Sequence, residues 1–297
     1  MTDELSPAFS HTLDEYKYGY MAARNLAERS RVDYETDQVQ FLAFLQGLYI
    51  HDLIKVEAKH VTAYLAELDR QKLKGSSRRR KLTVIRTFFA WLKEAGDISH
   101  DPTLHIKPPQ GGDKEPRVLT KDEYERVLAQ VQQPRDRAII QLVLQTGVRL
   151  SELYQLNLYD LKLPKRITSE AIGEVRIIGK GSKERTLILN TKACEALKTW
   201  LKVRPQVDTN AVFVSNRNQR LSKRQIQNIV DKYMEAAEIT DAGVHSLRHT
   251  FATHHVAQGT DIVTVHEVLG HESLDTTKIY ITLAKKQQAY YLQKNAL

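Results

Sequence analysis

Hydrophobic residues recur at three- and four-residue spacing through the first hundred positions of the chain. The pattern is clearest in residues 34–49, 61–68 and 82–92, where it predicts helices with one apolar face. No stretch of this half alternates between apolar and polar residues in the manner of a strand. We therefore expect a helical domain over residues 1–104.

A segment rich in proline and glycine follows this helical half. Residues 105–117 hold three prolines and two adjacent glycines, a composition that breaks regular structure. We expect this segment to be a linker, and residues 118–297 to form a second domain.

The second half has a mainly helical pattern with one short sheet. Thr120 and Glu123 predict a capping box at a helix start, and the apolar run 137–144 predicts a buried helix that ends near Gly147. Two β-branched runs, 174–178 and 185–189, flank a glycine-rich basic segment and predict a hairpin with a cationic tip. Further helices are expected at residues 192–203, 223–237, 249–258, 262–269 and 284–293.

Composition narrows the class of protein only slightly. Apolar residues make up 41% of the chain and charged residues 27%, which is typical of a soluble globular protein. The net charge of +8 favours a polyanionic partner but does not establish one. Cys194 is the only cysteine, so no internal disulfide forms, and we expect it to be buried. Because neither a signal peptide nor a membrane-spanning run is recognisable, we expect a cytoplasmic protein without membrane contact.

Basic residues without any acid fill the stretch between Arg70 and Arg86. A helix whose first turns meet a DNA backbone would carry such a run, with serines as cap and additional donors. A solvated basic face would give the same pattern. The candidates for DNA contact are Lys74, Ser76, Ser77, Arg78, Arg79, Arg80, Lys81 and Arg86.

Two arginines are candidates for binding a phosphate, because planar guanidinium groups hold and neutralise its non-bridging oxygens. These are Arg149 and Arg248. An isolated Arg149 would more often pair with Glu152 on its own helical turn. His245 lies three residues before Arg248, so both could reach one phosphate from the same helix face, although a lone His-x-x-Arg is common.

Three further residues could move protons or attack the phosphate. His271 follows Gly270 at the predicted end of a helix, where an imidazole with a pKa near neutrality can transfer protons. Tyr280 could be a nucleophile, although a tyrosine is more commonly a core residue. Lys180, between two glycines, could protonate a leaving 5′-oxygen or simply be solvated. Several histidines crowd this region, but no cysteine pair or His-Glu-x-x-His motif accompanies them, so we expect no metal.

Taken together, these motifs resemble the tyrosine recombinases of the phage integrase family, which includes the Xer proteins. The resemblance rests on Thr-Gly-Val-Arg149-Leu-Ser-Glu-Leu, Ile-Gly-Lys180-Gly-Ser-Lys-Glu-Arg, His245-Ser-Leu-Arg248-His and Leu-Gly-His271-Glu-Ser, followed by Tyr280, in this order. It implies phosphate clamps at Arg149 and Arg248, a general acid at Lys180, phosphate ligands and proton carriers at His245 and His271, and a nucleophile at Tyr280. It implies no cofactor.

The same resemblance implies an N-terminal SAM-like core-binding domain and a C-terminal catalytic domain with a small antiparallel sheet. A homotetramer, linked through the C-terminal helix, would act on double-stranded DNA with paired recombination sites, and accessory proteins are possible partners. Strand exchange would pass through a 3′-phosphotyrosine and a Holliday junction.

The expected role is integration, excision or resolution of a mobile element or replicon. Chromosome-dimer resolution of the Xer type is the alternative, since residues 161–173 form a longer connection than the compact Xer version. Two other classes stay open. A non-catalytic DNA-binding protein would never form a covalent complex, and a type IB topoisomerase would relax supercoils without joining two sites.

Overall fold

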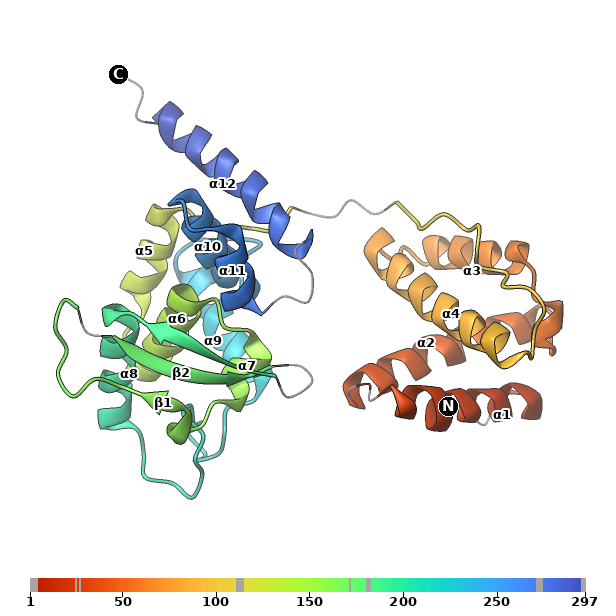
Figure 1. Cartoon of the computed structure of the whole chain (residues 1–297), viewed down its shortest axis with the longest axis horizontal. Helices are drawn as coiled ribbons and strands as arrows, with labels where there is room; N and C mark the ends of the chain where they lie inside the picture. The colour runs from red at the N-terminus through yellow and green to blue at the C-terminus, as the bar shows by residue number, and fades with distance from the viewer. Residues whose placement is uncertain are drawn as a thin grey trace. The chain divides into compact units, whose positions relative to one another are not determined.

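The computed structural model describes residues 5–24, 26, 28–110, 115–170, 172–179, 183–270 and 275–294. The chain divides into two compact units, Met1–Lys114 and Glu115–Leu297, which are described separately below (Figure 1). The division falls inside the segment 105–117 that the proline and glycine content marks as a linker.

The first unit is built from helices around an aromatic core. Its elements are α1 (Pro7–Glu15), the π-helical turn η1 (Tyr16–Met21), α2 (Glu28–Gly47), the 3-10 turn η2 (Leu53–Lys55), α3 (Ala58–Arg70) and α4 (Gly75–Ala95). Tyr16, Phe41, Phe88 and Phe89 are almost fully buried, and the rings of Tyr16 and Phe88 meet edge to face at 5.1 Å. The described residues of this unit include no strand, as the helical periodicity predicts.

Helix α4 carries the basic run, and it begins differently from the prediction. Its N-cap position is Lys74, whose side chain makes no capping hydrogen bond. Ser76 and Ser77 therefore lie inside the first turn, and their assignment as caps was wrong. The cause is a tight connection after α3, in which Lys72 adopts a φ of 60° and the Leu73 amide donates to the Leu68 carbonyl, so that the next helix starts early.

The second unit holds most of the helices and a three-stranded antiparallel sheet of order β1-β2-β3. Helix α6 lies at its centre, buried on nearly every face and in contact with α8, α10 and β3. In Figure 1 the sheet lies in front of α6 and α8. The elements are α5 (Lys121–Gln130), α6 (Pro134–Thr146), α7 (Leu150–Gln155), η3 (Leu158–Asp160), β1 (Leu161–Lys162), β2 (Gly173–Ile178), β3 (Glu184–Leu189), α8 (Thr191–Val203), α9 (Lys223–Ala236), α10 (Val244–Ala257), α11 (Ile262–Leu269) and α12 (Asp275–Lys294).

Local sequence signals in this unit are confirmed where they are strong. Thr120 caps α5 in a capping box: its hydroxyl accepts from the Glu123 amide, and the Glu123 carboxylate accepts from the Thr120 amide. Strands β2 and β3 pair as the expected hairpin, from Gly173 opposite Leu189 to Ile178 opposite Glu184. The short strand β1 was not predicted, because two residues are too few to show a period.

Two helices begin earlier than the hydrophobic pattern predicts. Helix α10 starts at Val244 instead of residue 249, and α12 starts at Asp275 instead of residue 284. The first turns of α12 are rich in threonine and isoleucine, which have low helix propensity. Packing overrides that propensity, because Thr277, Tyr280 and Leu283 on one face of the helix are buried.

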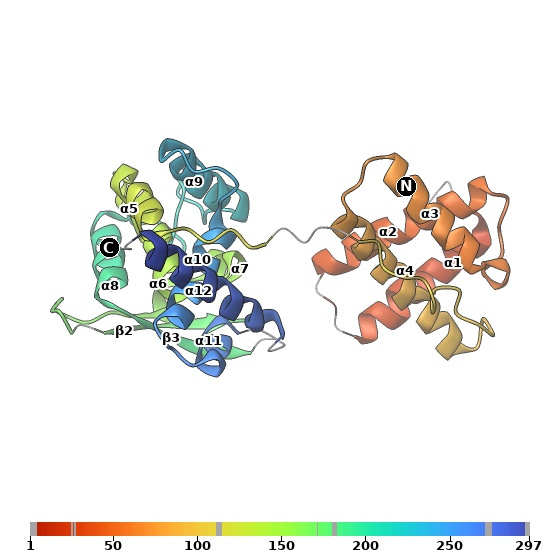
Figure 2. The same ribbon diagram turned by 90° about the horizontal axis from the view of Figure 1, so that it is seen from above.

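Helix α12 packs against its own unit over this first part. Tyr280 and Leu283 join Phe251 of α10 and Leu269 of α11 in one small apolar cluster, and Figure 2 shows α12 crossing α10 and α11. The stretch 289–293 belongs to α12, but the side chains of residues 290–292 lie outside the described part of the chain. None of the described helices combines the length and the hydropathy needed to cross a membrane.

Candidate active site

Arg149 lies where α6 gives way to α7. Gly147 ends α6 with a φ of 64°, and Arg149 then occupies the N-cap position of α7. The Arg149 amide donates to Oε2 of Glu152 at 2.8 Å, and its Nη1 donates to Oε1 of the same carboxylate at 2.9 Å. Its Nη2 donates to the Gly270 carbonyl. The pairing with Glu152 that the sequence offered as an alternative is therefore present, and it fixes the guanidinium beside the end of α11.

Glu152 is a buried carboxylate shared by two arginines. Its side chain is 3% exposed, and it also accepts hydrogen bonds from Nη1 and Nη2 of Arg185 on β3, at 2.8 and 2.9 Å. Burial alone would raise the pKa of Glu152, but the hydrogen bonds from Arg185 and Arg149 outweigh it and hold the pKa below its ordinary value. Glu152 is thus an anion at neutral pH that orients both guanidinium groups.

The last carbonyls of α11 bring three arginines together. Arg185 donates through Nε to the Val268 carbonyl at 3.0 Å, and Arg248 donates through Nη2 to the Leu269 carbonyl at 2.9 Å. Arg149 donates to the next carbonyl, that of Gly270. These carbonyls form the negative end of the helix dipole, which attracts cations. Three guanidinium groups thus gather at one helix end.

Arg248 is the most buried of the three. Its side chain, on α10, is 6% exposed and also donates to the Gly147 carbonyl. Burial, and after it the neighbouring cation Arg149, lower the pKa of Arg248 to about 10. Glu152 is the carboxylate that hydrogen-bonds in this cluster, so among the described residues three positive charges face one negative charge. An excess of buried cations is what an anion site requires.

Tyr280 lies beside this cluster and contacts a histidine. It is 1% exposed, and its hydroxyl lies 3.0 Å from Nδ1 of His249 on α10. Burial raises the pKa of Tyr280, while Arg248 and Arg149 act to lower it, so both cations lie within electrostatic reach of the phenol. Burial, His245 and Arg248 lower the pKa of His249 to about 4, which leaves its imidazole neutral at pH 7.

The structure brings part of the predicted set together. Arg149, Arg248 and Tyr280 share one site, and His245 lies one turn before Arg248 on α10. The His245 side chain is exposed, yet partial desolvation of the ring and the Arg248 charge lower its pKa. Lys180 and His271 lie outside the described residues. The residues just before them are described and lie near the arginine cluster. A methyl group added to Gly179, which precedes Lys180, would be 3.5 Å from Nη1 of Arg185, and the carbonyl of Gly270, which precedes His271, accepts a hydrogen bond from Arg149.

Three residues of the site were not assigned a role from the sequence. Glu152 was considered only as an ion-pair partner that would give Arg149 a structural role. Arg185 was one residue of a predicted strand, and His249 was one of several histidines close together in the sequence. Arg185 carries a usable signal, since a charge beside the apolar positions of a short strand needs a buried partner. The contact between His249 and Tyr280 joins residues 31 positions apart and leaves no local signal.

The candidates for DNA contact in the first unit differ in how they are placed. Lys74 and Ser76 are exposed, and Ser77 and Arg79 are half-buried. Lys81 is buried and donates to Asp37 at 2.6 Å and to Gln40 at 2.5 Å. Arg78 pairs with Asp69, Arg80 pairs with Asp37, and Arg86 donates to the Ile106 carbonyl. Arg79 also interacts within the protein.

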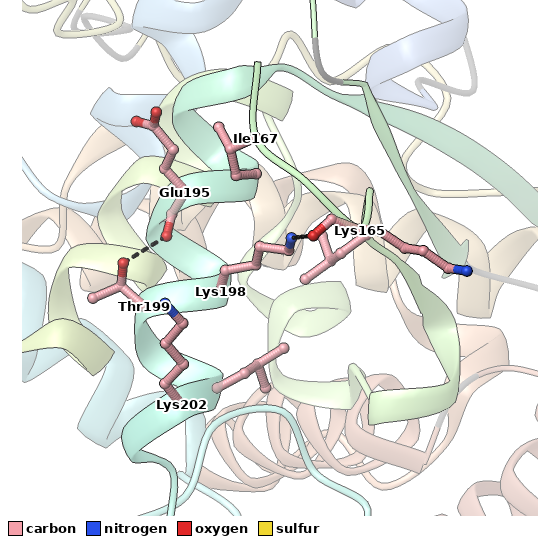
Figure 3. Close-up of a pocket in the computed structure, with 8 residues that line it drawn as sticks. Lys165, Ile167, Glu195, Lys198, Thr199 and Lys202 are labelled. Carbon is pink, nitrogen blue, oxygen red and sulfur yellow. Dashed lines mark hydrogen bonds between the residues drawn. The ribbon is translucent and has the colours of Figure 1, made fainter.

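A separate pocket of about 640 Å³ lies between residues 163–167 and α8 (Figure 3). Lys165, Lys198 and Lys202 stand around an apolar lining, and the Lys198 ammonium donates to the Lys165 carbonyl at 2.8 Å. The long connection 161–173 is thereby fastened to α8, and none of its lining residues belongs to the arginine cluster. Within the described residues, no group of three or more His, Cys, Asp or Glu side chains could hold a metal.

Comparison with known proteins agrees with this geometry. The catalytic model of the phage integrase family matches residues 117–287, and the model of its N-terminal SAM-like domain matches residues 13–96. The chain therefore belongs to the phage integrase family, and its class of activity is the site-specific cutting and rejoining of DNA by a tyrosine recombinase.

Curated relatives carry the name tyrosine recombinase XerC. The protein of Roseiflexus castenholzii is 32% identical over 95% of this chain and 90% of its own length. That of Pseudomonas syringae pv. tomato is 34% identical over 91% of both chains.

Two solved structures share the fold. One is a XerH site-specific recombinase bound to a palindromic difH substrate in a post-cleavage complex, with a TM-score of 0.73, 22% identity, and coverage of 92% of this chain and 82% of that one. The other is a lambda integrase dimer bound to a COC′ core site, with a TM-score of 0.70, 17% identity, and coverage of 91% and 94%. At these identities the likeness shows the fold alone.

Proposed function

We propose that Tyr280 attacks a DNA phosphate held by Arg149 and Arg248 and forms a 3′-phosphotyrosine. The observation that carries this proposal is the gathering of Arg149, Arg185 and Arg248 on three successive carbonyls of α11, with the Tyr280 hydroxyl within electrostatic reach. A phosphodiester supplies the missing negative charge. As the phosphorus becomes five-coordinate, charge builds on its oxygens, and each fixed guanidinium stabilises that charge by several kcal/mol.

The remaining catalytic roles follow the family pattern. Lys180 protonates the departing 5′-oxygen, and His245 and His271 bind the phosphate and carry protons. A 5′-hydroxyl of the partner DNA then reverses the attack, so a bond of similar energy replaces the one that was cut. Because the bond energies balance, strand exchange requires no nucleotide, and the guanidinium groups supply the positive charge that a metal ion provides in many nucleases.

A mutation of the nucleophile tests the proposal. A DNA duplex with a nick just 3′ of the scissile position loses its short 5′-hydroxyl fragment after cleavage, so the covalent product accumulates. The intact chain should form this product, and Tyr280→Phe should bind the same duplex without forming it. Covalent product from the Phe variant would show that another residue attacks.

We propose that the start of α4 contacts the DNA backbone. Exposed Lys74 and Ser76, with Ser77 and Arg79 beside them, lie at a helix N-terminus whose N-cap residue makes no side-chain capping hydrogen bond, and backbone N–H groups there favour an anion. We do not include Lys81 in this surface, because its ammonium is committed to Asp37 inside the unit.

The salt dependence of DNA binding distinguishes these two lysines. Each phosphate contact contributes about −0.9 to the slope of log K against log salt. Lys74→Ala should therefore reduce the slope by about one, whereas Lys81→Met should leave it unchanged and instead lower the thermal stability of the first unit. Equal slopes for Lys74→Ala and the unchanged chain would remove Lys74 from the interface.

For the biological role we propose resolution or exchange between paired sites by a homotetramer, through a Holliday junction. Two kinds of DNA substrate are candidates: a mobile element or replicon, and a chromosome dimer as in the Xer proteins. The names of the relatives above favour the second. Sequencing DNA covalently attached to the chain in cells separates them: one chromosomal site supports dimer resolution, and the borders of an element support the first role.

A further inference from the structure

We propose that His249 is a further catalytic residue: its Nδ1 accepts the hydroxyl proton of Tyr280 during attack on DNA and returns it during resealing. This inference rests on the nucleophile role proposed for Tyr280. His249 stands outside the six positions that the family motif supplies, and its role follows from the contact between two helices that the sequence does not reveal.

The geometry suits a proton transfer. The Nδ1 and Oη atoms are 3.0 Å apart, within hydrogen-bond distance, and the two rings lie 5.7 Å apart at an angle of 45°. Both residues stand on packed helices, α10 and α12, so neither depends on a loop for its position. Because Tyr280 is 1% exposed, bulk water has little access to the phenol, and an adjacent protein group is the better acceptor.

The protonation state of His249 also suits an acceptor. Burial and the charges of His245 and Arg248 keep its imidazole neutral at pH 7, with a pKa of about 4. In the neutral ring, Nε2 carries the proton when Nδ1 accepts the hydrogen bond from Tyr280. A DNA phosphate between Arg149 and Arg248 would offset their charge and make His249 more basic at the moment it is needed.

The atoms and protons of the step balance. The Tyr280 O–H bond breaks as Nδ1 of His249 gains the proton, the Oη–phosphorus bond forms, and the bond to the 5′-oxygen breaks. The general acid, proposed as Lys180, protonates that 5′-oxygen. Resealing runs in reverse, so His249 returns its proton to Oη and Lys180 recovers its own.

The test compares His249→Asn, which offers an amide oxygen near the Nδ1 position, with His249→Ala. The asparagine accepts a hydrogen bond but takes up no proton near neutrality. Removal of a general base costs about 10²- to 10⁴-fold in rate. Both variants should therefore cleave the nicked duplex this much more slowly at pH 7, with unchanged DNA affinity, and both rates should rise about tenfold per pH unit as hydroxide replaces the lost base.

Controls separate this from a structural role. His255 lies on the same helix and contacts Thr260, so His255→Asn should cleave like the unchanged chain. His245→Ala identifies any part of the pH profile due to His245. Among the described residues, His245 and Arg248 act electrostatically on His249, and Arg248 and Arg149 act on Tyr280.

Three outcomes would overturn the inference. The first is cleavage by His249→Asn at the unchanged rate, which would leave the residue only a hydrogen-bond acceptor. The second is a loss of activity in both variants with the same pH profile as the unchanged chain. If Tyr280→Phe still cleaved, the nucleophile assignment would fail first, which distinguishes failure of the proposed function from failure of this inference alone.

Discussion

Replacing Glu152 by Gln removes one charge from the centre of the site and keeps its shape. The carboxylate accepts four hydrogen bonds, from the amide and Nη1 of Arg149 and from Nη1 and Nη2 of Arg185, with its side chain only 3% exposed. The amide of Gln would turn two of its own hydrogens toward guanidinium donors. Two half-buried arginines would then lie close together without a carboxylate between them.

Breaking a buried ion pair by removing one partner costs about 3–5 kcal/mol. For a unit of this size, each kcal/mol lowers the melting temperature by about 2–4 °C, so Glu152→Gln should lower it by roughly 6–20 °C. Calorimetry of the whole chain can follow the unfolding of the second unit, with Glu184→Gln as matched control. Glu184 is 56% exposed and pairs with Arg176 at 3.4 Å, so its loss should cost less than about 1 kcal/mol.

The pH dependence of the protein's stability tests independently whether Glu152 stabilises the fold as an anion. The pKa of Glu152 is lower in the folded protein than its ordinary value of 4.5, so its stabilising contribution is fully present above that pH and is lost as the pH falls through the folded pKa. The difference in stability between the unchanged chain and Glu152→Gln should therefore be constant near neutrality and shrink in acid. A variant that melts within about 1 °C of the unchanged chain at pH 7 would refute this account of the cluster.

Three further substitutions test two residues of the site and one turn of the first unit. Gly270→Ala should reduce DNA cleavage strongly, because the φ of 63° at this position disfavours a side chain. The new methyl group would also lie 2.9 Å from Nη1 of Arg185 and 3.2 Å from Nη1 of Arg149. Cleavage at the unchanged rate would contradict this geometry. Arg185→Lys should lower both thermal stability and cleavage rate, since an ammonium cannot donate to both oxygens of Glu152 as the planar guanidinium does. An unchanged melting temperature and cleavage rate would contradict a role for this bidentate contact. Tyr49→Gly should stabilise the first unit by about 1 kcal/mol, because Tyr49 has a φ of 59° and is 90% exposed; a lower denaturation midpoint would show that its side chain has a stabilising contact.

Elements with local signals could be predicted from the sequence. The capping box at Thr120, the hairpin of residues 173–189 and the helix Thr191–Val203 depend on caps, β-branched runs and periodicity within a few residues. The first turns of α12 could not, because their threonines and isoleucines disfavour a helix until Tyr280 and Leu283 are buried against α10. The helical conformation of these turns depends on tertiary packing, which leaves no local pattern in the sequence.

The same distinction applies to the site. Arg149, Arg248 and Tyr280 stand in motifs that a family resemblance identifies, and the structure brings them to one place. Arg185 finds its carbonyl partner at the end of α11, and His249 on α10 contacts Tyr280 on α12, so the positions of both depend on tertiary packing. In the basic run of α4, the charge pattern made Lys81 a candidate for DNA contact, whereas its ammonium pairs with Asp37 inside the unit. The pattern of charges in a sequence does not show which side chains form ion pairs inside the folded protein.

The most direct test of the central claim is to identify the amino acid that becomes attached to DNA. The chain is trapped on the nicked duplex, the DNA and protein are digested, and mass spectrometry locates the modified peptide and the end of DNA it carries. The account predicts a single link from Tyr280 to a 3′-phosphate. A link to any other residue, or to a 5′-phosphate, would contradict it.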